Sequence, residues 1–158
     1  MATDILTGGT VTSNYSGEGN DNSLACDGDP ETSWYSDQFV APHWWKYNLG
    51  EGVTKKVVSL TILPYTFNPE FPFPTVKAFT LSGSNDDASY DLLYTGLHDN
   101  DCDKETYNFS NIVAYRYYKL DFSNSYAGMG IINVAELEMF EADETDAPTV
   151  YFPLPMRY

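Results

Sequence analysis

Oxygen-bearing side chains are concentrated in one turn-forming stretch, residues 27–32 (Asp-Gly-Asp-Pro-Glu-Thr). Carboxylate and hydroxyl oxygens packed on a tight turn suit a hard cation such as Ca²⁺. Acidic Asp-Gly turns are common, so the stretch predicts a cation site only together with its surroundings. A second acidic stretch, residues 99–103, begins like an EF-hand loop, but Lys104 stands at the required glycine position and Ser110 at the bidentate glutamate position. We interpret it as a solvated acidic loop.

Residues that would carry out catalysis are few. His43 and His98 are the two histidines, and neither lies in a motif typical of a serine hydrolase, a zinc protease or a cysteine–histidine pair. We expect His43 to be a loop or packing residue. Acidic residues are too numerous for a general acid–base pair to be singled out, so a glycosidase pair stays open as an alternative. We predict that the protein is not an enzyme.

The charge balance narrows the choice of partners. Eight basic against 23 acidic residues give a net charge of −15, which excludes nucleic acid and disfavours an anionic membrane surface. An acidic surface suits cations or a neutral partner, or simply keeps the protein soluble. The start of the chain does not resemble a signal peptide. Cys26 and Cys102 do not form a disulfide framework, and whether they pair stays open.

Apolar residues alternate with polar ones along several short segments, including 57–62, 79–82, 117–122 and 135–139. A period of two is typical of half-buried antiparallel strands, and no segment has the pattern of a long amphipathic helix. The sequence therefore predicts an all-β sandwich with long polar loops. The expected core residues are Trp34, Trp44, Leu60, Ile62, Phe79, Leu81, Tyr118, Leu120, Leu137 and Met139.

Five ordered segments resemble the motifs of discoidin domains, also called coagulation factor 5/8 type C domains. These segments are Asn22–Trp34, Pro42–Gly50, Phe79–Asp86, Ala114–Leu120 and Ala135–Phe140, and Asn48 stands where the family usually has Asp. The resemblance implies an eight-stranded antiparallel jelly-roll β-sandwich of the galactose-binding-like kind over residues 1–142. Such domains are usually non-catalytic.

The resemblance also implies a structural Ca²⁺ between the Asp-Gly turn and the last strand. Asp27 and Glu136 would give carboxylates, and Thr32 its hydroxyl and carbonyl oxygens. Leu24, Asp29 and Ala135 would give backbone carbonyls. This oxygen-only set agrees with the chemistry that calcium prefers. The alternative is that Glu136 and Glu138 merely face solvent.

Carbohydrate-binding relatives clamp sugars with loop arginines, a histidine and a stacked aromatic ring, whereas the loops of this chain contain no arginine. Binding therefore stays open, while a preference for galactose or fucose does not follow. The remaining ligand-binding candidates lie on loops that we expect to cluster at one rim of the sandwich: Tyr35, Asp37, Gln38, Phe67, Asn68, Phe71 and Tyr126.

Residues 52–62 and 109–122, together with the missing signal peptide, resemble discoidin copies found in bacteriophage virion proteins. This implies a binding module on a virus particle that recognises cell-surface carbohydrate or decorates the capsid or tail. It would then be exposed on the virion or outside the cell, and otherwise cytoplasmic. The alternatives are a purely structural virion protein that makes protein–protein contacts, and a fragment of a carbohydrate-active enzyme.

The resemblance ends near Glu141, which leaves residues 143–158 as a separate tail. The tail begins acidic and becomes apolar, and its prolines keep it extended. We expect it to act as a docking arm that contacts a neighbouring subunit, giving a homo-oligomer, or another particle protein. Packing on its own domain is the alternative.

Overall fold

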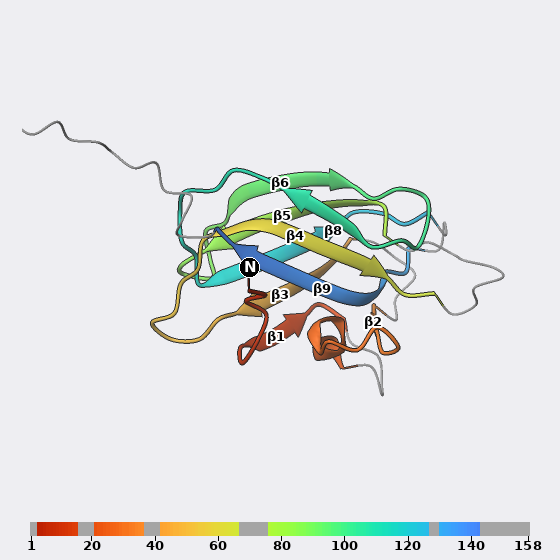
Figure 1. The fold of residues 1–158 in the computed structure, drawn as a ribbon, viewed down its shortest axis with the longest axis horizontal. Coiled ribbons are helices and arrows are strands. Elements are labelled where there is room, and N and C mark those ends of the chain that lie inside the picture. Colours follow the sequence, from red (N-terminus) through yellow and green to blue (C-terminus); the bar gives the residue numbers. More distant parts are fainter. Residues whose placement is uncertain (1–2, 16–20, 37–41, 67–75, 127–129, 143–158) are drawn as a thin grey trace, which may run out of the picture.

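Two antiparallel sheets make up the computed structural model, which describes residues 3–15, 21–36, 42–66, 76–126 and 130–142 (Figure 1). The five-stranded sheet has the order β1 (Thr10–Ser13), β3 (His43–Asn48), β8 (Tyr117–Phe122), β5 (Ala78–Ser84), β6 (Asp91–Leu97). The four-stranded sheet has the order β2 (Trp34–Tyr35), β9 (Asn133–Glu141), β4 (Val57–Pro64), β7 (Glu105–Asn108). A short 3₁₀ helix, η1 (Asn22–Cys26), precedes β2. The all-β sandwich predicted from the alternation is confirmed.

The described residues form nine strands rather than the expected eight. The shortest, β2, has two residues and pairs with β9 through Trp34 and Val134. A two-residue strand is too short for alternation to reveal it in a sequence. No helix in the described ranges is long and apolar enough to cross a membrane. Both cysteines are free thiols.

The inner faces of the two sheets bury the core between them. Strand β4 brings Leu60 opposite Met139 and Ile62 opposite Leu137 of β9, so that these side chains share one face. Nine of the ten expected core residues are buried: Trp34, Leu60, Ile62, Phe79, Leu81, Tyr118, Leu120, Leu137 and Met139.

Trp44 was expected in the core, and this prediction is wrong. In β3 the buried positions are His43, Trp45 and Tyr47, whereas Trp44 is half-buried. Trp45 lies opposite the core residue Leu120, and because residues directly opposite share a face, Trp44 is placed on the outer face. There the ammonium groups of two lysines, Lys46 and Lys119, each lie 5.7 Å from the centre of its ring.

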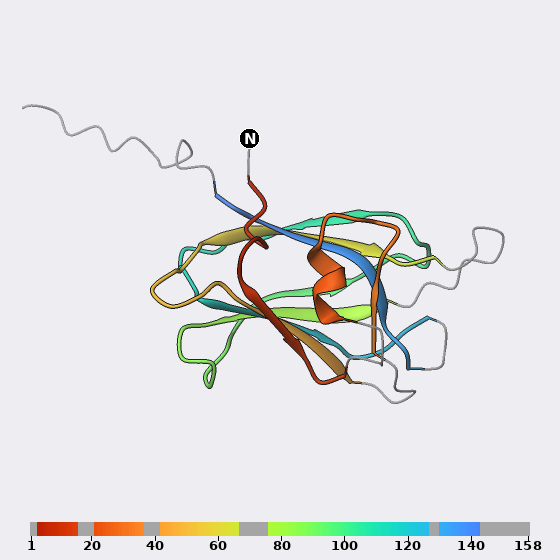
Figure 2. The ribbon, with the colours of Figure 1, turned by 90° about the horizontal axis from the view of Figure 1, so that it is seen from below.

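Strand β9 is also contacted by segments outside the two sheets. Helix η1 lies at the edge of the sandwich, where it contacts β9 of one sheet and β1 of the other, and its Ala25 is fully buried (Figure 2). The N-terminal segment adds a bridge between Asp4 and Phe140. A bulge shifts the register of β9 between Val134 and Glu136, and the strand buries consecutive residues from Asn133 to Leu137 instead of every second one.

Four of the connections between strands lie at one end of the sandwich, as the pairing registers show. In the larger sheet, Phe122 at the end of β8 lies opposite His43 and Phe79, near the starts of β3 and β5. In the smaller sheet, the end of β4 meets the start of β9. The connections 36–42, 65–77, 98–104 and 123–132 therefore leave from this end, which we call the loop end.

The neighbouring tryptophans of β3 give a matched test of the fold. Trp45→Ala removes a fully buried side chain and should lower the free energy of unfolding by about 3–5 kcal/mol. Trp44→Ala removes a half-buried ring and its lysine contacts, and should cost about 1–2 kcal/mol. Urea denaturation of both variants measures the difference. Equal losses, or a larger loss for Trp44→Ala, would contradict the assignment of faces.

Candidate functional site

The turn that follows η1 is built by local hydrogen bonds. The Asp21 side chain caps η1 by accepting from the Ser23 backbone N–H at 2.9 Å. After the helix, Gly28 adopts φ +81°, a conformation that glycine reaches without strain. The Asp29 N–H then donates to the Asp27 carboxylate at 2.9 Å. These bonds fix the direction of the turn without help from the core.

Oxygen atoms converge inside this turn. The Thr32 hydroxyl lies 2.9 and 3.1 Å from the two Asp27 carboxylate oxygens and 3.0 Å from the Asp29 backbone oxygen. The Thr32 N–H also donates to that backbone oxygen at 3.1 Å. Three of the predicted calcium ligands, Asp27, Asp29 and Thr32, are therefore brought together.

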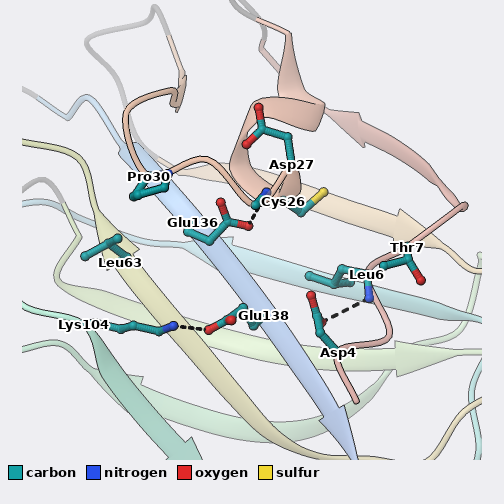
Figure 3. A pocket seen from close by; sticks show the side chains of 11 residues that line it. Asp4, Leu6, Thr7, Cys26, Asp27, Pro30, Leu63, Lys104, Glu136 and Glu138 are labelled. Atoms are coloured by element: carbon teal, nitrogen blue, oxygen red, sulfur yellow. Dashed lines mark hydrogen bonds and ion pairs between the residues drawn. The ribbon is translucent and has the colours of Figure 1, made fainter.

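Glu136 reaches the same turn from β9. One of its carboxylate oxygens accepts a 3.3 Å hydrogen bond from the Gly28 N–H, across 108 residues of sequence (Figure 3). The other, Oε2, is buried and has no hydrogen-bond partner among the described residues. Glu136 is 9% exposed, so the alternative of a solvent-facing glutamate does not hold. Its neighbour Glu138 is half-buried and forms an ion pair with Lys104.

Burial raises the pKa of the Glu136 carboxyl from an ordinary 4.5 to about 7. Repulsion from Asp27, Glu138 and Asp4 adds to this effect, and the Gly28 hydrogen bond opposes it. Asp4 also has a raised pKa, mainly because of burial. A bound cation would remove both the desolvation penalty and the repulsion, because it supplies positive charge to the carboxylates.

The predicted metal ligands differ in how far the structure brings them together. Leu24 belongs to η1 and Ala135 is buried beside Glu136 on β9, so both lie on the elements that flank the turn. Asp27 and Glu136 are the two carboxylates of the set, and in Figure 3 the Asp27 carboxylate points away from Glu136. A cation between them would depend on neutral oxygens for its remaining ligands.

A pocket of about 430 Å³ lies beside this turn, with Cys26, Asp27 and Glu136 among its lining residues (Figure 3). Burial raises the pKa of the Cys26 thiol to about 12, and the nearby carboxylates add to the shift. The thiol is therefore protonated at neutral pH and is a poor nucleophile. The other polar side chains of this pocket are four carboxylates, the Thr7 hydroxyl and the Lys104 ammonium.

The structure describes two of the predicted sugar-binding residues, Tyr35 and Tyr126, and both lie at the loop end. Tyr35 is half-buried at the end of β2. Tyr126 is also half-buried; its hydroxyl donates to the His98 carbonyl oxygen at 2.9 Å, and the Lys77 ammonium lies 4.9 Å from the ring centre. Asp37, Gln38, Phe67, Asn68 and Phe71 lie outside the described residues, as does the tail 143–158.

Both histidines are buried, and His43 is a packing residue as expected. His43 is a fully buried strand residue whose Nε2 lies 2.7 Å from the Gly130 carbonyl oxygen. His98, also fully buried, groups with Asp101 and Glu105, with one potential metal-ligand atom from each lying within 4.8 Å of the others. The acidic run 99–103 was interpreted as a solvated loop, and the signal that would have found this group is the histidine just before it.

The raised pKa of Glu136 predicts a pH dependence for the metal-free protein. Below pH 4.5 the carboxyl is protonated in both the folded and unfolded states, so its contribution to stability is fully present. Between pH 4.5 and about 7 the unfolded chain ionises first, and the free energy of unfolding falls as the pH rises. Chelator-treated protein should therefore lose stability across this window. Glu136→Gln should lose less, as measured by urea denaturation at several pH values; identical profiles for both proteins would contradict the assignment.

The family model for the F5/8 type C domain matches residues 9–137. None of the curated proteins matches the chain. Among solved structures, the family 32 carbohydrate-binding module of Clostridium perfringens NanJ, in complex with galactose, is similar with a TM-score of 0.75 and 21% identity. The match covers 89% of this chain and 100% of the NanJ module.

Two further structures show the same fold. The module CpGH89CBM32-5 of Clostridium perfringens, in complex with GalNAc-β-1,3-galactose, has a TM-score of 0.73 and 19% identity, with 87% of this chain and 99% of that chain covered. Chitosan-binding module 1 of a Paenibacillus sp. IK-5 chitosanase/glucanase has a TM-score of 0.71 and 20% identity, with 87% and 98% covered. The sandwich geometry and the family match agree, and the chain belongs to the F5/8 type C domain family, whose members are also called discoidin domains.

Proposed function

We propose that this protein is a non-catalytic module that binds carbohydrate at its loop end and holds a structural Ca²⁺ at the turn 27–32. The observation that carries the first part is the position of Tyr126, which lies where four connections converge. Similar modules are described in complex with galactose and with GalNAc-β-1,3-galactose. Two fully buried histidines support a non-catalytic role, because neither imidazole is open to a substrate at the surface.

Tyr126 has the properties of a sugar-stacking platform. Its hydroxyl is held by the His98 carbonyl and Lys77 sits over the ring, so the ring is fixed in direction before any ligand arrives. A ring held in this way loses little conformational entropy when a sugar packs on it. The candidates outside the described residues, from Asp37 to Phe71, would add polar and aromatic contacts.

The ligand class proposed is a neutral surface glycan bound without arginine. Arg116 lies next to β8 at the end opposite the loop end, and its Nε donates to Asn48 at 2.9 Å. It is therefore too far away to clamp a sugar beside Tyr126. Carboxylate, amide and aromatic side chains, together with Lys77 beside the Tyr126 ring, are left to provide recognition.

The calcium site is proposed from the chemistry of the donors. Asp27, Thr32 and the Asp29 carbonyl form one oxygen cluster, and Glu136 offers a buried oxygen without a partner among the described residues. An orphaned buried carboxylate oxygen is costly, and a hard cation would satisfy it. Backbone carbonyls of Leu24 and Ala135 would complete the set. The ion would fasten the turn to β9.

The setting proposed is the surface of a virus particle, with the module facing either a host glycan or a neighbouring virion protein. The support is the amino-acid sequence of residues 52–62 and 109–122, which resembles discoidin copies in bacteriophage proteins. The tail 143–158 would serve as the docking arm. Sedimentation separates the two roles, since sugar binding by a monomer favours the glycan role and stable oligomers without sugar binding favour the structural one.

Replacement of Tyr126 tests the sugar site. A glycan array first identifies a ligand, and titration calorimetry then measures its Kd. Tyr126→Ala should weaken binding by about tenfold or more, as expected for the loss of an aromatic anchor. Tyr126→Phe keeps the ring and should retain most of the affinity.

Tyr90→Ala is the matched control, because Tyr90 lies at the opposite end of the sandwich, just before β6. It should leave the affinity unchanged. An array with no hits, or an unchanged Kd for Tyr126→Ala, would overturn the proposed sugar site.

Removal of calcium tests the metal site. An ion held only by the folded state, at 100 times its Kd, stabilises by about 2.7 kcal/mol, so a chelator should lower Tm by about 5–10 °C. Asp27→Ala should abolish this sensitivity because it removes one of the two carboxylates. Differential scanning calorimetry with and without chelator provides the measurement.

Glu138→Gln is the control for the metal site, since Glu138 is a neighbouring β9 carboxylate that pairs with Lys104 instead. This variant should keep the chelator effect. Wild-type protein that melts at the same temperature with and without chelator would count against a calcium site.

A further inference from the structure

We propose that His98, Asp101 and Glu105 form a second metal site, specific for a divalent transition-metal ion such as Zn²⁺ and separate from the turn 27–32. The three residues lie between β6 and β7, at the loop end. One potential ligand atom from each lies within 4.8 Å of the other two, and no other such group is found in the described ranges.

The spacing of the group fits a small ion. The His98 Nδ1 lies 3.4 Å from the Glu105 Oε1. Two ligands of a tetrahedral Zn²⁺, each about 2.0–2.1 Å from the metal, lie about 3.3–3.4 Å from one another. These two atoms therefore already span one edge of a zinc coordination sphere, and Asp101 provides the third ligand.

Two of the three residues are positioned by strands of different sheets. His98 follows directly after β6 of the five-stranded sheet, and Glu105 begins β7 of the four-stranded sheet. The His98 N–H donates to the Lys77 carbonyl at 2.8 Å, which anchors the histidine backbone. An ion at this point would link the two sheets across their edge.

The carboxylates are oriented by hydrogen bonds from their surroundings. Glu105 accepts from the Tyr107 hydroxyl at 2.6 Å and from the Asp99 N–H at 2.8 Å. Asp101 accepts from the Asp103 N–H at 3.0 Å. Such outer contacts fix metal ligands in direction and are typical of built metal sites.

The His98 imidazole is fully buried and packs edge-on against Tyr107, so its Nδ1 cannot turn away from the group. Nδ1 lies 3.0 Å from the Asp99 carbonyl oxygen, an acceptor, so it carries the proton in the metal-free protein. A metal ion on Nδ1 would displace that proton, and the imidazole would then be protonated on Nε2. Nε2 has no hydrogen-bond partner among the described residues, and we therefore expect moderate affinity.

Charge and ligand type decide which ion is bound. The segment 98–105 contains four carboxylates and one lysine, Lys104, whose charge is already paired with Glu138. A strong local negative potential attracts divalent cations. An imidazole nitrogen with two carboxylates suits Zn²⁺ and related ions, whereas Ca²⁺ takes oxygen ligands only. The ligand types therefore separate this site from the one proposed for calcium.

The test uses the full chain without a histidine tag, with Zn²⁺ as the probe. Titration calorimetry should give one site of moderate affinity per chain, and excess Zn²⁺ at about 100 times its Kd should raise Tm by about 5–10 °C. Asp101→Asn should weaken Zn²⁺ binding by at least about tenfold, because loss of even an outer-shell contact has that effect. Asp103→Asn removes the same charge from the same loop but no ligand atom, and should weaken Zn²⁺ binding far less than Asp101→Asn.

Nitrogen-15 NMR of His98 supplies a readout that a nonspecific charge effect would not change. Zn²⁺ should shift the Nδ1 resonance and move the proton to Nε2. His98→Gln should abolish Zn²⁺ binding, and Asp101→Asn tests the same site should the buried substitution prevent folding. No Zn²⁺ binding by the wild type, or equal weakening by Asp103→Asn, would overturn the proposal.

The calcium site and the zinc site can be tested independently of each other. Asp101→Asn should retain the chelator-sensitive calcium effect, and Asp27→Ala should retain the Zn²⁺ effect. Loss of both effects in either variant would show a single shared site and would overturn the zinc assignment.

Discussion

Strand β9 is buried along consecutive residues, and the rest of the structure depends on this burial. Leu137 and Met139 pack into the core between the sheets, while η1 contacts the strand at the edge of the sandwich and the N-terminal segment pairs with it. Glu136 lies opposite Leu63, contacts the Gly28 N–H of the turn and is 9% exposed. The same packing that completes the core therefore places a carboxylate in a site of low polarity, where its charge is costly.

That cost explains why the turn 27–32 and β9 belong together as a site. The turn satisfies its own groups through Asp27, Asp29 and Thr32, and offers β9 only the Gly28 N–H. One N–H does not compensate a buried carboxylate facing three other acidic residues, as its raised pKa indicates. A protein with a net charge of −15 gains most from a cation at the place where carboxylates are both crowded and buried.

Much of the fold was predictable, because alternation along single strands is a local property. In segment 117–122 the apolar series Tyr118, Leu120 and Phe122 is buried as predicted, and so are Leu60 and Ile62 in segment 57–62. At the start of β4 a register shift buries Val57 and leaves Val58, the expected inward residue, half-buried. The β3 segment His-Trp-Trp-Lys-Tyr-Asn has a tryptophan at an even position and another at the following odd position. The alternation of apolar residues therefore does not show whether Trp44 or Trp45 faces the core. Only pairing with β8 settles the face, through Leu120 and Asp121. Pairing between strands 70 residues or more apart is not visible in one sequence.

The candidate sites show the same division between local and distant information. Asp27, Asp29 and Thr32 lie within six residues, so their convergence followed from the turn pattern. The burial of Glu136 could not be predicted, because its side chain meets the turn at Gly28, 108 residues away in the sequence. His98 and Glu105 are only seven residues apart, yet a strand pattern gives no sign that their strands join different sheets. The two proposed cation sites thus have a common cause, since each lies where a turn or loop meets strand residues that the sandwich has already fixed in place.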